Sequence, residues 1–137
     1  MGYRGSHRFI PADGGDAASR RAKRRLARDP RCLDLIRVVA ARRRVPLTEL
    51  LSTKRGVPAA AEARQLAMYL LHVLVGRPQD VVAALLGRER STVSYACRLM
   101  EERRDDPAFE AEIAAIEHRF FPAESADEQA EGSCHAA

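Results

Sequence analysis

Residues 78–104, with the sequence PQDVVAALLGRERSTVSYACRLMEERR, decide the fold of this chain. Pro78 comes directly before a short predicted helix over residues 79–86, and Gly87 ends that helix because glycine tolerates the left-handed backbone of a helix end. The side chains expected to face the core are Val81, Val82 and Leu85. Arg88-Glu89-Arg90 then forms a tight polar connection to the next helix.

The second helix of this segment is predicted to begin where Ser91 or Thr92 caps it and to run to about residue 104. Its apolar stripe consists of Val93, Ala96, Cys97 and Met100, and the side chains that point elsewhere are Ser94, Tyr95 and Arg98. A short helix, a turn and a second helix with a polar start describe a helix-turn-helix, in which the second helix enters the major groove of DNA. A plain helical hairpin shows the same pattern and remains an alternative.

Four more helices are expected around this pair, which makes the fold all-α, a compact bundle of about six helices. Asp29 as N-cap and Pro30 begin the first helix, which ends in Arg42-Arg43-Arg44. A short helix over 46–51 follows, then a basic loop over 52–58 that contains Lys54 and Arg55. The main core helix covers about 60–75, with Leu66, Tyr69, Leu70, Val73 and Leu74 inward and Gly76 at its end. Asp106 and Pro107 begin the last helix, whose inward side chains are Phe109, Ile113, Ile116 and Phe120.

The two ends of the chain differ in charge and predict tails. Residues 1–100 contain 20 Lys and Arg against 8 Asp and Glu, whereas residues 101–137 contain 3 against 11. We therefore expect a flexible basic arm over 1–28, a domain over 29–121 and a disordered acidic tail over 122–137, with the tail as a possible site for a protein partner. The basic part makes nucleic acid the first partner to test.

The composition also argues against several classes of protein. No stretch approaches the roughly 20 apolar residues of a membrane span, and residues 1–8 lack the apolar run of a secretory signal. Cys32, Cys97 and Cys134 are far apart, which favours a reducing environment, so a cytoplasmic, nucleoid-associated protein is expected. No membrane partner is expected.

The segments ARQLAMYL at residues 63–70 and GRERSTVSYAC at residues 87–97 together resemble the DNA-binding domain IV of the chromosomal replication initiator DnaA. The family pattern is A-R-Q-x-A-M-Y-L, a short spacer helix, and G-R-D-H-[ST]-T-V-x-x-A. Residues 45–52, VPLTELLS, are similar to the short helix that precedes these motifs in the family. The resemblance spans residues 32–104 and implies an all-helical domain, distantly similar to the Trp repressor type, that reads double-stranded DNA.

The resemblance also implies roles for single residues. Arg64 matches the family's minor-groove arginine, and Arg88, Ser91 and Thr92 match contacts to phosphate or to a thymine methyl group. Glu89 replaces an aspartate that accepts a hydrogen bond from cytosine, and Arg90 replaces a histidine, so the preferred site is expected to differ from the initiator's own box. The full set of expected DNA-binding residues is Lys54, Arg55, Arg64, Arg88, Glu89, Arg90, Ser91, Thr92, Ser94, Tyr95 and Arg98.

Other chemistry finds little support in the sequence. The chain has no G-x-x-x-x-G-K-[ST] phosphate loop, and its histidines and cysteines do not form a spacing typical of a metal site. Cys134-His135 is a weak pair, while Cys32 and Cys97 fall on apolar stripes. We expect no enzyme activity, no metal, no cofactor and no bound nucleotide.

Three functions agree with this pattern. The first is a transcriptional regulator that binds specific duplex DNA sites. The second is a replication-control protein that occupies initiator-type sites or competes for them. The third is a protein-interaction module in which DNA binding is vestigial.

Overall fold

The computed structural model describes residues 16–54 and 56–121, and within them every regular element is a helix. Seven helices follow one another in these residues: α1 Ala17–Leu26, α2 Pro30–Arg43, α3 Leu47–Leu51, α4 Pro58–Val73, α5 Gln79–Leu86, α6 Arg90–Arg103 and α7 Pro107–Phe120. The prediction of an all-α bundle is confirmed, with one more helix than expected.

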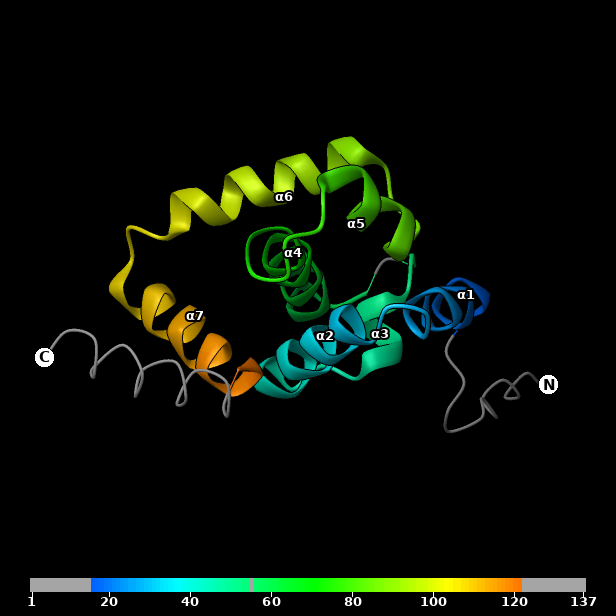
Figure 1. Ribbon diagram of the computed structural model, residues 1–137, viewed down its shortest axis with the longest axis horizontal. Coiled ribbons are helices and arrows are strands. Elements are labelled where there is room, and N and C mark those ends of the chain that lie inside the picture. The colour runs from blue at the N-terminus through cyan, green and yellow to red at the C-terminus, as the bar shows by residue number, and fades with distance from the viewer. Residues whose placement is uncertain (1–15, 55, 122–137) are drawn as a thin grey trace, which may run out of the picture.

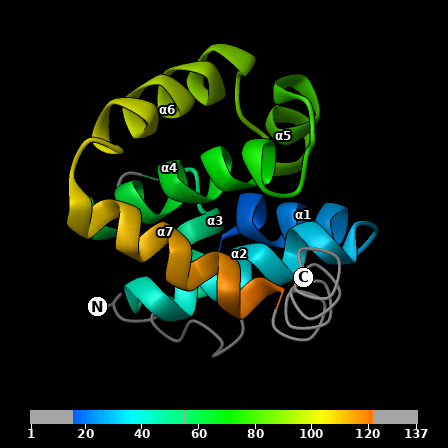
Figure 2. The same ribbon diagram turned by 60° about the vertical axis from the view of Figure 1, so that its left-hand side comes forward.

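Helix α4 lies at the centre of the bundle. It contacts α2, α3, α5 and α6, and Figure 1 shows these helices around it. Leu66 and Leu70 of α4 are completely buried, and Tyr69 is almost so. The Tyr69 hydroxyl donates to the Glu101 carboxylate at 2.6 Å, which joins the central helix to α6. Figure 2 shows α7 passing across the bundle on the side of α2.

Local signals explain where most helices begin and end. Pro30, Pro58 and Pro107 occupy the first turn of their helices, where a missing N–H has no cost. The Asp106 side chain accepts from the Ala108 N–H at 3.0 Å, which caps α7 as expected. Gly87 closes α5 with φ 66°, in the left-handed region that suits glycine.

The prediction of a flexible arm over residues 1–28 is wrong for residues 17–26, which form α1. The residues Ser19, Ala22 and Leu26 are completely buried and lie at helical spacing. One long apolar side chain and two small ones thus form the face of α1 that packs against α3 and α5. Residues 1–15 and the expected acidic tail, 122–137, lie outside the described residues.

Three details of the expected helices also differ. Helix α6 begins at Arg90 with Glu89 as its N-cap, so Ser91 and Thr92 lie inside the first turn rather than capping it. Val73 and Val81 were expected inward, but their side chains are 45% and 38% exposed. Each valine lies at the edge of the apolar stripe of its helix. The buried residues beside them are Leu70 in α4 and Val82 in α5.

Asp29 occupies the predicted N-cap position of α2 but makes no capping hydrogen bond. Its carboxylate accepts two hydrogen bonds from Arg77, each at 2.9 Å, and this pair fastens the start of α2 to the loop before α5. The hydrogen bonding from Arg77 lowers the pKa of Asp29 to about 2.

Within the described residues, no helix has the length and apolar character that a membrane crossing requires.

Candidate nucleic-acid interface

Helices α5 and α6 meet at a turn of three residues, Gly87 to Glu89. The Arg88 N–H donates to the Ala83 carbonyl at 2.9 Å, which folds the chain back at the end of α5. Val82 and Leu86 of α5 are buried, as are Val93 and Ala96 of α6. The two helices are therefore held against each other as the bracing and reading helices of a helix-turn-helix.

The N-terminal part of α6 presents polar side chains to solvent. Arg90, Ser91, Thr92, Tyr95 and Arg98 are all exposed, and Ser94 is half-buried. The Arg98 guanidinium lies 5.7 Å from the centre of the Tyr95 ring, so these two residues form one exposed cation–π pair. This face of α6 combines hydrogen-bond donors with a flat aromatic surface.

The backbone at the start of α6 adds further donors. Glu89 makes no side-chain capping bond, so the first N–H groups of the helix are not satisfied by its carboxylate. A helix start of this kind accepts a phosphate oxygen readily, because its free N–H groups and its dipole both favour an anion.

Arg64 and Arg88 are placed differently from the exposed residues of α6. Arg64 donates from Nε to the Leu50 carbonyl at 2.8 Å and from a terminal nitrogen to the Glu49 carbonyl at 3.1 Å. Arg88 donates to the Ser52 carbonyl at 2.6 Å, and its Nε is buried without a partner in the described residues. Both arginines therefore hold the end of α3 and the start of the basic loop.

Burial disfavours the charged form of both side chains. Desolvation lowers the pKa of Arg64, and the nearby positive charge of Arg88 lowers it further. Desolvation also lowers the pKa of Arg88, while the negative charge of Asp16 opposes that shift. The two arginines and Asp16 thus form one charged group beneath the basic loop.

The basic loop follows directly from this group. Lys54 is exposed, and its N–H donates to the Ser52 hydroxyl at 3.0 Å, which gives the loop a fixed first turn. Arg55 lies outside the described residues. The hydrogen bonds of Arg64 and Arg88 therefore bring the end of α3 and the start of the basic loop close to the turn into α6. Figure 1 shows α1 on the same side of the molecule as α5.

The contribution of α1 is the part of this region that sequence reasoning missed. The Asp16 carboxylate caps α1 by accepting from the Ser19 N–H at 2.8 Å, and it also accepts from the Ser52 hydroxyl at 2.8 Å. Although burial opposes the shift, these hydrogen bonds lower the pKa of Asp16. The signal that predicts this helix is an aspartate cap followed by small and apolar residues at spacings of three and four.

Arg25 connects α1 to the helix-turn-helix itself. Its Nε donates to the Leu85 carbonyl at 3.0 Å, near the end of α5. A Cβ atom added at Gly87 would lie 2.8 Å from a terminal nitrogen of Arg25. Glycine suits the positive φ at this position, and a larger residue would also displace the end of the Arg25 side chain.

The remaining candidate residues have structural surroundings. Cys32 and Cys97 are buried as expected, and burial raises the pKa of the Cys32 thiol to about 12. The Nδ1 atom of His72 lies 2.9 Å from the Arg77 carbonyl. Among the described residues no three His, Cys, Asp or Glu side chains gather in a way that could hold a metal ion. His7, Cys134 and His135 lie outside the described part of the chain.

Comparison with known proteins agrees with this geometry. The family model described as the bacterial DnaA protein helix-turn-helix matches residues 33–99. The chromosomal replication initiator protein DnaA of Sphingopyxis alaskensis is 40% identical over 85 residues, which cover 61% of this chain and 18% of that protein. The protein of the same name from Acinetobacter baumannii is 41% identical over 76 residues, covering 54% of this chain and 16% of that protein.

The chain thus spans less than a fifth of the length of these relatives. The matched residues contain α3, α4 and α5 with most of α2 and α6, whereas α1 and α7 lie outside them. The motifs at residues 63–70 and 87–97 fall within the matched part, on α4 and on the turn into α6. Residues 33–99 of this chain are therefore a relative of the helix-turn-helix domain IV of DnaA.

Proposed function

We propose that this chain binds double-stranded DNA at specific sites, with α6 in the major groove, and acts as a transcriptional regulator. The observation that supports this most directly is the exposed polar start of α6, presented by a helix-turn-helix that is related to that of DnaA. The start of the basic loop is hydrogen-bonded to Arg88 of the turn before α6, and Lys54 supplies positive charge there for the phosphate backbone.

The polar residues at the start of α6, with its N-cap Glu89, form three groups by their chemistry. Arg90 and Glu89 stand at the entrance of the helix, where arginine can pair with the O6 and N7 atoms of guanine and glutamate can accept from a cytosine amino group. Ser91, Thr92 and Ser94 are short side chains suited to phosphate or to a thymine methyl group. Tyr95 and Arg98 extend the same face by about one turn toward the middle of the helix.

Arg64, Arg88 and Lys54 are proposed to act at the edge of the interface. Arg64 donates to carbonyls of α3 and Arg88 to the Ser52 carbonyl at the start of the loop, so their contribution is to hold the loop in the shape that meets the duplex, with their charge close to it. Lys54 and Arg55 are proposed to contact phosphates or the minor groove from the loop itself.

A second candidate function is replication control at initiator-type sites. The identity to DnaA proteins across the helix-turn-helix favours it. The two functions differ in the DNA sequence that is preferred, since a competitor of the initiator must share its sites, whereas Glu89 and Arg90 favour a different one.

The test is a selection of bound duplexes from a random pool, followed by affinity measurements on the selected site at several salt concentrations. We expect micromolar or tighter binding in moderate salt and an affinity that falls linearly with salt on a log–log plot, because phosphate contacts release counterions. A selected site identical to the initiator's box favours replication control. Binding that is independent of salt, or equally tight on RNA hairpins, contradicts the proposal.

A further inference from the structure

Helix α1 has an outer face made of arginines. Its ten residues include no acid, and its buried residues Ser19, Ala22 and Leu26 occupy the opposite face. Arg21, Arg24 and Arg28, the last just beyond its C-terminal end, recur at spacings of three and four, so they lie along one stripe. All three side chains are exposed, and no ion pair within the described residues involves them.

The acid nearest to this stripe in the sequence does not neutralise it. Asp29 follows Arg28 directly, but both of its carboxylate oxygens accept hydrogen bonds from Arg77. Arg25 donates to the Leu85 carbonyl. It lines a cavity with Arg28, Asp29 and Asp80, in which Arg28 makes no ion pair with a described residue. Arg25 therefore attaches the helix to α5, and Arg21, Arg24 and Arg28 carry the positive charge of the stripe.

The contacts of α1 place this stripe beside the turn that leads into α6, the helix proposed to read the bases. Asp16 at the start of α1 is bonded to Ser52 of the basic loop, and Arg25 lies over the turn between α5 and α6. Figure 1 shows α1 and α5 together at one side of the molecule and α7 at the other. A stripe from Arg21 to Arg28 spans about 10 Å, at 1.5 Å per residue, which is comparable to the axial rise of about three nucleotides of one strand.

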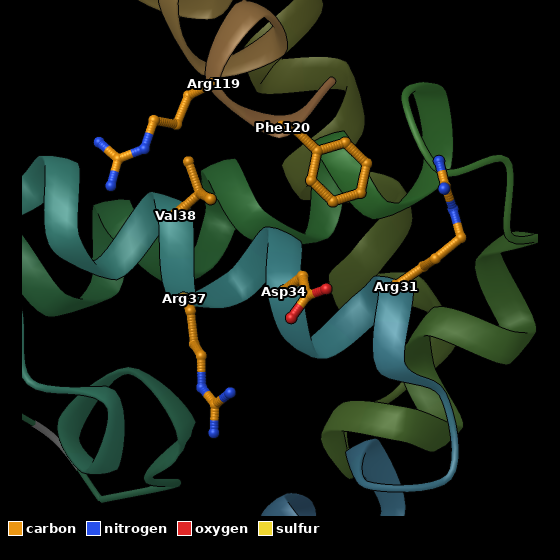
Figure 3. A pocket seen from close by; sticks show the side chains of 6 residues that line it. All are labelled: Arg31, Asp34, Arg37, Val38, Arg119 and Phe120. Atoms are coloured by element: carbon orange, nitrogen blue, oxygen red, sulfur yellow. The ribbon is translucent and has the colours of Figure 1, made fainter. Parts of the chain in front are cut away.

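The arginines around the cavity between α2 and α7 lack this arrangement. Arg31, Arg37 and Arg119 line a cavity between α2 and α7 together with Asp34. Figure 3 shows their side chains pointing in three different directions, and the Arg31 guanidinium lies 5.1 Å from the centre of the Phe120 ring. These three arginines carry the same charge as Arg21, Arg24 and Arg28, but they do not form a stripe.

We propose that α1 is a second DNA-contacting element, in which Arg21, Arg24 and Arg28 bind phosphates that flank the base pairs read by α6. This inference rests on the proposed DNA binding by α6. It adds a contact that is independent of base sequence, since a row of arginines on a helix outside the grooves meets only the backbone. The binding site on DNA is then longer than the segment that α6 can read.

The experiment compares two triple variants with the same loss of charge. Arg21→Gln, Arg24→Gln and Arg28→Gln remove the stripe, and Arg31→Gln, Arg37→Gln and Arg119→Gln, at the cavity between α2 and α7, serve as the control with the same loss of charge. Glutamine removes the charge but is polar and has a helix propensity similar to that of arginine, so α1 is expected to remain folded, which circular dichroism and thermal unfolding verify.

The affinity of each variant for a duplex carrying the selected site is measured over a range of NaCl concentrations. We expect the log–log salt slope of the α1 variant to be shallower than that of the parent by about 2 to 3, because three phosphate contacts are lost. The control is expected to change the slope by less than about 1, through net charge alone. Equal slopes for the two triple variants would falsify the role of α1.

Ethylation interference on the same duplex gives a second, positional measurement. With the parent protein, ethylated phosphates on one flank of the α6 segment are expected to block binding, and that flank should become insensitive in the α1 variant only. If the triple variant does not fold, the single variants Arg21→Gln and Arg24→Gln are mapped instead. A parent protein that binds no duplex refutes the proposed function itself, whereas a parent with an unchanged flank refutes only the contact by α1.

Discussion

Helices α1 and α7 both lie outside the part of the chain that matches the DnaA helix-turn-helix, yet they extend it in different ways. Helix α1 packs against α3 and α5, next to the turn into α6, and its charged residues are all basic. Helix α7 packs against α2 on the other side, and its Glu112 binds Arg43 at 2.6 Å. The first extension adds positive charge beside a candidate DNA surface, whereas the second uses its charges to hold the bundle together.

This comparison depends first on α1 being a folded part of the bundle. Leu26→Ala removes a completely buried side chain and is expected to lower the free energy of unfolding by about 2–5 kcal/mol. Ile116→Ala in α7 is the matched variant, because that side chain is equally buried. Urea denaturation measures both. A Leu26→Ala protein as stable as the parent would show that α1 is not packed on the bundle and behaves as a flexible arm.

The next test concerns the start of α6, which α1 is proposed to flank. Arg90→His is expected to weaken binding to the selected site by about 1–3 kcal/mol and to alter the preference at one base pair, since histidine cannot make the paired contact to guanine. The measurement is a repeated site selection with the variant. An unchanged base preference with uniformly weaker binding would assign Arg90 to a phosphate instead.

A smaller effect is expected at the contact between α1 and the turn. Gly87→Ala places a Cβ atom at a residue with φ 66° and close to Arg25, so we expect a loss of stability of about 1–2 kcal/mol. Part of this loss comes from displacing Arg25, and it should disappear in an Arg25→Ala background. Gly56→Ala, where nothing lies within 4 Å, is the control. Identical costs of Gly87→Ala in both backgrounds would mean that Arg25 gives way freely.

The smallest effect is a dependence on pH at the Asp29–Arg77 pair. The pKa of Asp29 is lowered to about 2 in the folded chain from an ordinary value of 3.8. A lowered pKa stabilises the folded state above the ordinary value, and this contribution is lost as the pH falls from about 4 toward 2. Asp29→Asn should therefore be less stable than the parent at neutral pH and nearly equal to it at about pH 2. A constant difference across that range would show that the pair does not act through ionisation.

The sequence predicts the interior of this fold better than its electrostatic details. The bounds of α5 and the start of α7 follow from Pro78, Gly87, Asp106 and Pro107, because these residues act on the backbone locally. Helix α1 was missed since Leu26 is its only long apolar residue, and the remaining contacts come from Ala22 and Ser19. The Asp16 cap and the spacing of its small residues indicate a helix, but the surfaces of α3 and α5 that stabilise it depend on the tertiary fold.

In the candidate site, too, the sequence predicts what depends on local spacing and not what depends on tertiary contacts. The exposed residues of α6 were predicted because helical spacing separates them from the buried stripe. The hydrogen-bond partners of Arg64 and Arg88 were not predicted. The acceptors are backbone carbonyls of residues 49, 50 and 52, and their position depends on the tertiary fold. Arginine alone indicates positive charge, but not whether that charge is free.

The hydrogen bonds from Arg64 and Arg88 to the end of α3 have a consequence for the thermodynamics of binding. A long side chain loses up to about 2 kcal/mol of conformational entropy when it becomes ordered. Here that loss occurs when the chain folds, because both side chains already have protein acceptors. The loop that they hold therefore meets a partner in a pre-organised shape, and association is opposed by less disorder than if both arginines were mobile.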